Sequence, residues 1–379
     1  LLPILLHLSV LVASLQAALV NDLTFILNGD GTEYSVTDCQ TSARGTLFIP
    51  SVYEGLPVTS IGYRAFYGSN LTSITIPDGV TSIGYQAFSY CTSLSSITIP
   101  DGVTSIGYEA FTYCTSLTSI TIPDSVTSIG EGAFDNCRGL SSIVIGDGVT
   151  SIGEFAFNGC TSLTSVNIPD SVTSIGNGAF YNCTSLTSVI IPDSVTSIGQ
   201  YAFQSCTSLT SVIIPDSVTS IGQYAFQSCT SLTSINLPNS LNSIEASTFS
   251  QCTSLNSIII PISVTSIGVG AFSVCSSLTS ITIPSSVTSI GIIAFSGSGL
   301  QSVTFEGDAP NLTTNTFINV SATIYYYDDA TGFSAPTFLG RPSQMLIRDT
   351  TPRLPVFELD SFYESFQYES VTVDATPTD

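Results

Sequence analysis

The chain has 379 residues with six arginines, no lysine and 28 acidic residues, which give it a formal net charge of −22. Nucleic acids and anionic membrane surfaces require a basic footprint on the protein, so this charge excludes both as partners. Hydrophobic residues make up 43% of the chain and charged residues only 9%, so serine and threonine hydroxyls must supply much of the polar surface.

Residues 1–18 form a nearly continuous apolar run that ends in small residues, LLPILLHLSVLVASLQAA. Such a run is typical of the apolar core of a secretory signal peptide, and the lack of a basic start indicates a signal truncated at its beginning. The alternative is an uncleaved anchor helix, although His7, Ser9 and Gln16 interrupt the run. Both interpretations place the remaining chain outside the cell, so we predict a secreted or cell-surface protein without membrane insertion of the mature repeats.

Residues 19–50 lack the repeat that follows and contain the stretch LTFILNGDGTEYSVTDC. Two runs of alternating apolar residues flank Asn28, Gly29, Asp30 and Gly31, a composition that favours a tight turn. We therefore predict a β-hairpin that serves as an N-terminal cap by covering the exposed edge of the first coil.

Residues 51–305 repeat with a period of 23 residues, and the copies at Ser188–Thr210 and Ser211–Thr233 are identical. Fixed spacing over such a length is typical of a solenoid, in which each coil buries its apolar face only against its neighbours. We predict about eleven coils on this basis. One phenylalanine marks each coil, and these residues are Phe66, Phe88, Phe111, Phe134, Phe157, Phe180, Phe203, Phe226, Phe249, Phe272 and Phe295.

One coil can be interpreted from the stretch LSSITIPDGVTSIGYEAFTYCTS, which begins at Leu94. Its first apolar residues have the L-x-x-I-x-I spacing of a leucine-rich-repeat strand, and Pro100 ends that strand because it cannot donate to the ladder. A second short apolar segment follows, and then one helical turn is predicted around Phe111. The residues expected to point inward are Leu94, Ile97, Ile99, Val103, Ile106, Ala110, Phe111 and Cys114.

The consensus I-x-I-P-D-x-V-x-x-I-G-x-x-A-F-x-x-C-x-x-L runs through residues 47–305 and resembles the BspA-like leucine-rich-repeat family of bacterial surface proteins. The resemblance implies a right-handed leucine-rich-repeat solenoid of mostly short parallel β-strands, with the sheet on the concave side. It also implies display at the cell surface and adhesion to molecules of a host or a neighbouring cell. It does not identify a ligand.

The end of the chain departs from the repeat. Residues 306–347 include ATIYYYDDATGF, which predicts one more strand, and we interpret this region as a C-terminal cap. Residues 348–379 include TTPRLPVFELDSFYESF, which we interpret as a linker or the start of a further region.

Nine cysteines recur at the repeat spacing from Cys91 to Cys275, and Cys39 stands apart. Equivalent residues of a solenoid stack in a row with parallel Cβ vectors, so the nine cannot all pair as disulfides. A straight row also lacks the tetrahedral convergence that zinc needs. We therefore predict buried free thiols that act as small apolar side chains.

Aspartates form a second row, because each follows the residue that ends a strand. One interpretation is that every carboxylate caps its own turn. The other is a track for cations, in which the six aspartates from Asp101 to Asp216 bind calcium weakly. The members of the row are Asp78, Asp101, Asp124, Asp147, Asp170, Asp193 and Asp216.

A third row is formed by the outward residue in the middle of each predicted strand, and a column of serines flanks it. Threonine occupies this position near both ends of the repeats, and β-branched or amide residues occupy it in the centre. Such residues suit any exposed strand, but a contiguous apolar strip also marks interaction sites. The candidate ligand-binding residues of this concave row are Val144, Asn167, Ile190, Ile213, Asn236 and Ile259.

An enzyme is not expected. His7 is the only histidine and lies in the predicted signal peptide, and no lysine is present, so Ser-His-Asp, Cys-His and Ser-Lys catalysis are excluded for the mature chain. A glycosidase needs two carboxylates in different environments, whereas a repeated row makes neighbouring carboxylates alike.

Two functional hypotheses follow from the repeats. The first is a secreted or surface-displayed protein that binds proteins or glycans of a cell surface or matrix through its concave face, as a monomer and without a cofactor apart from weak calcium binding. The alternative is a passive spacer or stalk that presents a further C-terminal domain. Variation in the central row favours the first hypothesis, and the identical copies favour the second.

Overall fold

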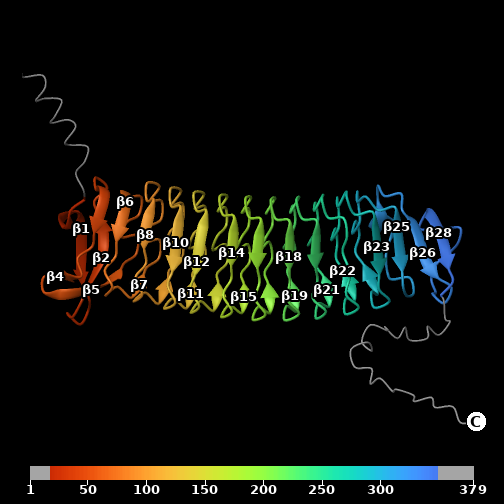
Figure 1. Cartoon of the computed structure of the whole chain (residues 1–379), viewed down its shortest axis with the longest axis horizontal. Coiled ribbons are helices and arrows are strands. Elements are labelled where there is room, and N and C mark those ends of the chain that lie inside the picture. The colour runs from red at the N-terminus through yellow and green to blue at the C-terminus, as the bar shows by residue number, and fades with distance from the viewer. Residues whose placement is uncertain (1–17, 349–379) are drawn as a thin grey trace, which may run out of the picture. The chain divides into compact units, whose positions relative to one another are not determined.

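The computed structural model describes residues 18–348. Nearly all of the predicted signal peptide and of the predicted C-terminal linker therefore lies outside the described residues. The described residues form a solenoid whose coils stack side by side along its long axis (Figure 1). None of the helices in this part of the chain has the length and apolar character needed to cross a bilayer.

The N-terminal end begins with a 3-10 helix, η1 (Val20–Asp22), which leads into strands β1 (Leu23–Leu27) and β2 (Tyr34–Cys39). These two strands pair antiparallel, in the region for which a hairpin was predicted. Strand β2 then pairs in parallel with β5 (Leu56–Ile61), while β4 (Val52–Tyr53) pairs antiparallel with β5. The hairpin thus covers the edge of the first coil and supplies its hydrogen-bonding partner.

Each coil contributes a first strand that ends before the proline position, except the coil around Ile259, where this stretch is not a strand. Equivalent residues of successive coils pair in parallel, as Ser165 does with Ser188 and Asn167 with Ile190, because the 23-residue period returns the same residue to the same place. These strands are β3 (Arg44–Phe48), β6 (Asn70–Thr75), β8 (Ser96–Thr98), β10 (Ser119–Ile122), β12 (Ser142–Ile145), β14 (Ser165–Asn167), β16 (Ser188–Ile190), β18 (Ser211–Ile213), β20 (Ser234–Asn236), β23 (Ser280–Ile283) and β25 (Ser302–Phe305).

A second, two-residue strand follows the proline turn in each coil and forms a separate parallel sheet that starts at the hairpin. Its side chains alternate between a serine and a buried isoleucine. The strands are β7 (Ser82–Ile83), β9 (Ser105–Ile106), β11 (Ser128–Ile129), β13 (Ser151–Ile152), β15 (Ser174–Ile175), β17 (Ser197–Ile198), β19 (Ser220–Ile221), β21 (Ser243–Ile244), β22 (Ser266–Ile267) and β24 (Ser289–Ile290).

The second sheet is interrupted between β19 and β21. A glycine follows the isoleucine in nearly every coil, and a Cβ added at Gly176 would lie 2.7 Å from the backbone carbon of Gly153. Coils therefore approach closely at this column, where glycine leaves room that a side chain would fill. Glu245 occupies the column at the interruption, so we attribute the break in the sheet to its side chain.

The core is a continuous stack of phenylalanine rings. Phe180 is 0% exposed and lies between Phe157 and Phe203. Neighbouring rings from Phe66 to Phe317 are nearly parallel, and their centroids lie 5.0–5.8 Å apart. Leucine, isoleucine, valine, alanine and cysteine columns surround the stack and are buried as the period predicts.

The predicted helical turn around Phe111 is wrong in detail, because the segment is a series of tight turns. Glu109 and Tyr113 have φ angles of 50° and 59°, in the left-handed region, and a helix cannot continue through such residues. Their amides instead reach the next coil, in the way that Phe88 N donates to Ala110 O at 2.7 Å. We call this part of the surface the turn side.

The C-terminal end continues the solenoid beyond the predicted repeats. The 3-10 helix η2 (Thr314–Phe317) places Phe317 on the ring stack, and β26 (Thr323–Tyr327) and β28 (Arg341–Leu346) extend the first sheet in parallel from β25. Strand β27 (Thr337–Phe338) pairs antiparallel with β28. The solenoid therefore has about fourteen turns rather than eleven, since both ends add turns without the consensus.

Replacement of Phe180 by alanine tests the ring stack. The change leaves a cavity between two coils, so we expect the free energy of unfolding to fall by about 3–5 kcal/mol. Denaturant unfolding followed by circular dichroism measures it. Phe155→Ala is the matched control, because Phe155 lies in the same coil as Phe157 but is 37% exposed. Equal losses for the two variants would show that the rings do not form the core.

Candidate binding surface on the strand face

The outward side chains of the first strands, from β6 to β23, form a surface that we call the strand face. The predicted central row lies on it in full. Val144, Ile190 and Ile213 are 60%, 64% and 74% exposed, and Ile259, in the unpaired stretch between β20 and β23, is 85% exposed. Asn167 and Asn236 are also exposed and share the row through the register of β14, β16, β18 and β20.

The aspartate row lies where the first strands end, and its side chains are exposed. Two of them hold the next coil rather than their own turn, because the amide of Asp147 donates to Asp124 Oδ1 at 2.9 Å and the amide of Asn239 donates to Asp216 Oδ1 at 2.8 Å. Within residues 18–348 no group of three or more histidine, cysteine or acidic side chains converges as a metal site. The calcium hypothesis for Asp101 to Asp216 thus stays a prediction.

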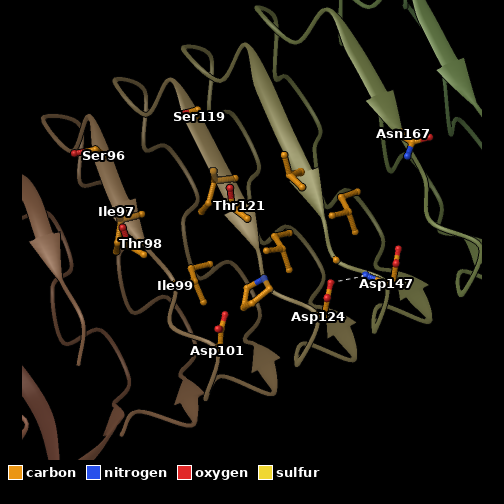
Figure 2. A pocket seen from close by; sticks show the side chains of 16 residues that line it. Ser96, Ile97, Thr98, Ile99, Asp101, Ser119, Thr121, Asp124, Asp147 and Asn167 are labelled. Atoms are coloured by element: carbon orange, nitrogen blue, oxygen red, sulfur yellow. Dashed lines mark hydrogen bonds between the residues drawn. The ribbon is translucent and has the colours of Figure 1, made fainter. Parts of the chain in front are cut away.

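The two predicted rows meet in one groove, which the sequence did not indicate. A hollow of about 840 Å³ spans β8, β10, β12 and β14 and is lined by Thr98 and Thr121 of the strand row and by Asp101, Asp124 and Asp147. Figure 2 shows the threonines along the strands and the aspartates in line where the strands end. Hydroxyl groups and carboxylates therefore line the same hollow, an arrangement that suits hydrogen-bonding ligands.

The chemistry of the strand face changes along the solenoid. A smaller hollow of about 430 Å³ near β23 is lined by Ile259, Ile262, Thr282 and Glu306. Ile262 stands at the position of the aspartate row and is 82% exposed. The strand face is thus polar and acidic between β8 and β14 and has exposed isoleucines toward β23.

Most other hydroxyls hold coils together. Thr104 Oγ1 donates to the carbonyl of Thr81 at 3.3 Å, and Thr127 Oγ1 donates to that of Thr104 at the same distance. Ser125 Oγ donates to the carbonyl of Val103 at 2.6 Å. These bonds repeat along the chain and explain why threonine and serine columns are constant.

All ten cysteines are free and buried, as predicted. Their thiols donate across coils, for example from Cys183 Sγ to the carbonyl of Phe157 at 3.1 Å. Burial raises the pKa of Cys183 and of Cys229 to about 12. A protonated, inaccessible thiol is a poor nucleophile and a poor metal ligand, so the cysteine row contributes packing.

Exposed tyrosines on the turn side were not recognised from the sequence. Two columns of them occupy the first three coils, beginning at Tyr63 and Tyr67. The sequence did contain an indication of the first column, because Tyr63, Tyr85 and Tyr108 recur at nearly the repeat spacing.

Short parallel strands that recur every 23 residues along a solenoid with a buried consensus define a leucine-rich-repeat protein. A family model described as the BspA type leucine rich repeat region matches residues 59–146, 127–218 and 196–323, in six copies. The chain therefore belongs to the BspA-type leucine-rich-repeat family. No curated protein matches its sequence.

Solved structures of bacterial repeat proteins resemble the chain. A leucine-rich-repeat protein from Bacteroides ovatus is 25% identical, with a TM-score of 0.55 over 80% of this chain and 98% of that one. A leucine-rich cell surface protein from Faecalibacterium prausnitzii is 35% identical over 76% of this chain and 94% of that one, with a TM-score of 0.47. The pneumococcal vaccine antigen PcpA, 18% identical over 86% and 97% with a TM-score of 0.54, shares the fold.

We expect the cysteine row to make the free energy of unfolding depend on pH in the alkaline range. Unfolded thiols ionise near pH 9.0, whereas buried Cys229 stays protonated to about pH 12, so unfolding releases protons in this range. The free energy of unfolding should then fall as the pH rises above about 9. Urea unfolding across this range measures the slope. A Cys206→Ala, Cys229→Ala variant should show a shallower fall, and an unchanged slope would contradict the assignment.

We expect the aspartate row to make the stability of the protein depend on salt. Neighbouring carboxylates lie within a Debye length, so screening should raise the melting temperature of the wild type. An Asp147→Asn, Asp170→Asn variant should respond less to sodium chloride, whereas a variant with Asp30→Asn and Glu245→Gln, two carboxylates outside the row, should respond like the wild type. Calcium chloride at matched ionic strength separates binding from screening. Equal salt responses in all three proteins would exclude both roles.

Proposed function

We propose that the protein is an extracellular adhesion module that binds a protein or glycan partner through its strand face. The observation that supports this most strongly is the row of exposed residues in the middle of the first strands. Val144, Ile190, Ile213 and Ile259 are each at least 60% exposed, although apolar side chains at these positions add nothing to the core. Ile190 and Ile213 are direct neighbours in the register of β16 and β18, and exposed apolar neighbours of this kind are typical of interaction sites.

The pattern of variation supports the same surface. The phenylalanine, glycine and threonine columns are nearly constant because each fills space or bonds to the next coil. The central row instead changes between threonine, valine, asparagine and isoleucine. Variation is tolerated where the solenoid does not need a given residue, and this freedom is available for recognition.

The groove over β8 to β14 suits the polar part of such a partner. Thr98, Thr121 and the aspartates beside them offer hydroxyl donors and carboxylate acceptors over several coils. Many weak contacts at equivalent positions add up to useful avidity when a repetitive ligand lies along the solenoid. A chain with a net charge of −22 favours partners that are neutral or basic.

The proposed role is binding and not catalysis. Successive coils give their side chains nearly the same environment, and the identical copies at Ser188–Thr210 and Ser211–Thr233 extend a surface without creating a unique site. Membership of the BspA-type family supports an extracellular location, since a structural relative is described as a cell surface protein.

Two charges on the central row test the proposal. Ile190→Asp with Ile213→Asp should leave the melting temperature nearly unchanged, because both side chains are exposed. The affinity for purified matrix glycoproteins and for the glycans of an array should fall by about tenfold or more. Binding by surface plasmon resonance measures both sets of ligands.

The control places the same charges in the same coils on another side, as Gln200→Asp with Gln223→Asp. This variant should bind like the wild type. If the wild type binds and the Ile190→Asp, Ile213→Asp protein, still folded, binds equally well, the strand face is not the site. If the wild type itself binds none of these ligands, the spacer hypothesis gains support.

A further inference from the structure

Six tyrosines gather on the turn side of the first three coils, after β5, β7 and β9. They form two columns of three, one beginning at Tyr63 and the other at Tyr67. Tyr63, Tyr67, Tyr85 and Tyr90 are 59%, 42%, 41% and 43% exposed. We call the surface made by the two columns and the residues between them the tyrosine patch, and the six residues are Tyr63, Tyr85, Tyr108, Tyr67, Tyr90 and Tyr113.

The tyrosine patch is rigid. The rings of Tyr85 and Tyr108 stack with centroids 4.9 Å apart, and those of Tyr90 and Tyr113 stack with centroids 4.8 Å apart. A stacked ring has already lost its rotamer freedom on folding, so little entropy is lost when a partner covers it. Tyrosine and arginine are the residues that supply most interface energy for this reason.

A charged column runs between the two tyrosine columns. The Arg64 guanidinium lies 5.2 Å from the ring centroid of Tyr63 and 4.7 Å from that of Tyr67. Arg64 Nε donates to Gln86 Oε1 at 2.5 Å, and Gln86 Nε2 donates to Glu109 Oε2. The order along the solenoid is therefore positive, neutral and negative, with one residue per coil.

The solenoid does not require this patch. In the next coil Glu131 and Asn136 occupy the two tyrosine columns and Gly132 occupies the column between them, yet the coils stack in the same way. Arg64 is also the single basic residue at its position in any coil from Phe66 to Phe295. The six tyrosines and the ordered charges thus belong to the surface and not to the repeat.

We propose that the tyrosine patch is a weak, isologous docking site for a second copy of this chain. The two solenoids lie antiparallel. They are related by a twofold axis that lies between them, perpendicular to their long axes, at the coil of Gln86. Reversal of the column brings Arg64 of each copy opposite Glu109 of the other. Gln86 is only 8% exposed, so it lies at the axis but beneath the contact surface.

The same axis matches the tyrosine columns. Tyr63 of one copy faces Tyr108 of the other, Tyr85 faces Tyr85, and Tyr90 faces Tyr90, because an axis across the solenoid returns each column to itself. Isologous contacts of this kind are the commonest route to homodimers. A register shifted by one coil would place Glu109 opposite Gln86 and leave Arg64 opposite uncharged residues, so the charges select one arrangement.

The size of the patch predicts the strength of the contact. Only three coils contribute, and the first and third lie about 10 Å apart at one strand spacing per coil. A contact this short buries less area than the roughly 800 Å² per partner of a standard stable interface. The net charge of −22 on each copy also opposes the contact, which the local pairing of Arg64 with Glu109 has to overcome. We therefore expect a monomer at low concentration and a dimer at high concentration, in contrast to the monomer alone that the sequence predicted. Copies held close together on a surface would be dimeric.

Charge reversal provides the test, with sedimentation equilibrium of the full chain at physiological ionic strength as the measurement. In Arg64→Glu both charged groups of the column are carboxylates, and in Glu109→Arg both are guanidinium groups. Each variant alone should therefore self-associate at least about tenfold more weakly than the wild type. An equimolar mixture of the two should form a heterodimer, because acid then faces base in both directions.

Two further variants separate the contact from folding. Tyr85→Ser with Tyr90→Ser should abolish association, while Tyr201→Ser with Tyr224→Ser, which removes a stacked pair with ring centroids 5.0 Å apart outside the patch, should leave it unchanged. Circular dichroism confirms that each variant folds. A wild type that remains monomeric up to about 1 mM, or a mixture of charge variants that fails to associate, would overturn the proposal.

Discussion

Hydrogen bonds between neighbouring coils are the interaction on which the whole structure depends. On the strand face the first strands pair in register, as Ser165 does with Ser188. On the turn side Phe88 N donates to Ala110 O at 2.7 Å. A single coil has neither set and buries no ring stack, so no coil is stable alone and stability grows with the number of neighbours.

These bonds explain the unusual composition. Serine and threonine hydroxyls donate to carbonyls of the preceding coil, in the manner of Thr127 to Thr104, and buried thiols such as Cys183 do the same. Uncharged polar side chains thereby satisfy the hydrogen-bonding groups of the backbone. The chain can dispense with lysine, and many of its acidic residues remain on exposed positions such as Asp147.

Positions outside this bonding scheme are free to carry function. On the strand face they are the central row with Ile190 and Ile213 and the neighbouring groove. On the turn side they are the columns of Tyr63, Arg64 and Tyr67. Two surfaces on different sides of one solenoid would allow the proposed partner and a second copy to bind at the same time.

The sequence predicted the features that the period controls. The ring stack, the strands before the prolines and the exposure of Ile213 all follow from a side chain returning to the same place every 23 residues. It did not predict the left-handed turns, because Gln86, Glu109 and Phe155 share that conformation without sharing chemistry. Beyond Phe305 it predicted one strand, where β26 lies, but not the further turns, in which hydrogen bonding continues without the consensus.

The groove also escaped prediction for a physical reason. The strand row and the aspartate row lie three residues apart in each coil, but it is the direction of the chain after the proline that lets Thr121 and Asp124 line one hollow. The tyrosine patch was missed because its columns recur in only three coils and therefore do not enter the consensus.

Hydrogen exchange measured by mass spectrometry tests the central claim most directly. If coils are held together on both sides, the amides of the turn segment 109–114 should be protected as strongly as those of β10. Both should exchange only by opening of a whole coil interface. Rapid exchange in the turn segment beside a protected β10 would contradict the account, because the solenoid would then be held by its strands alone.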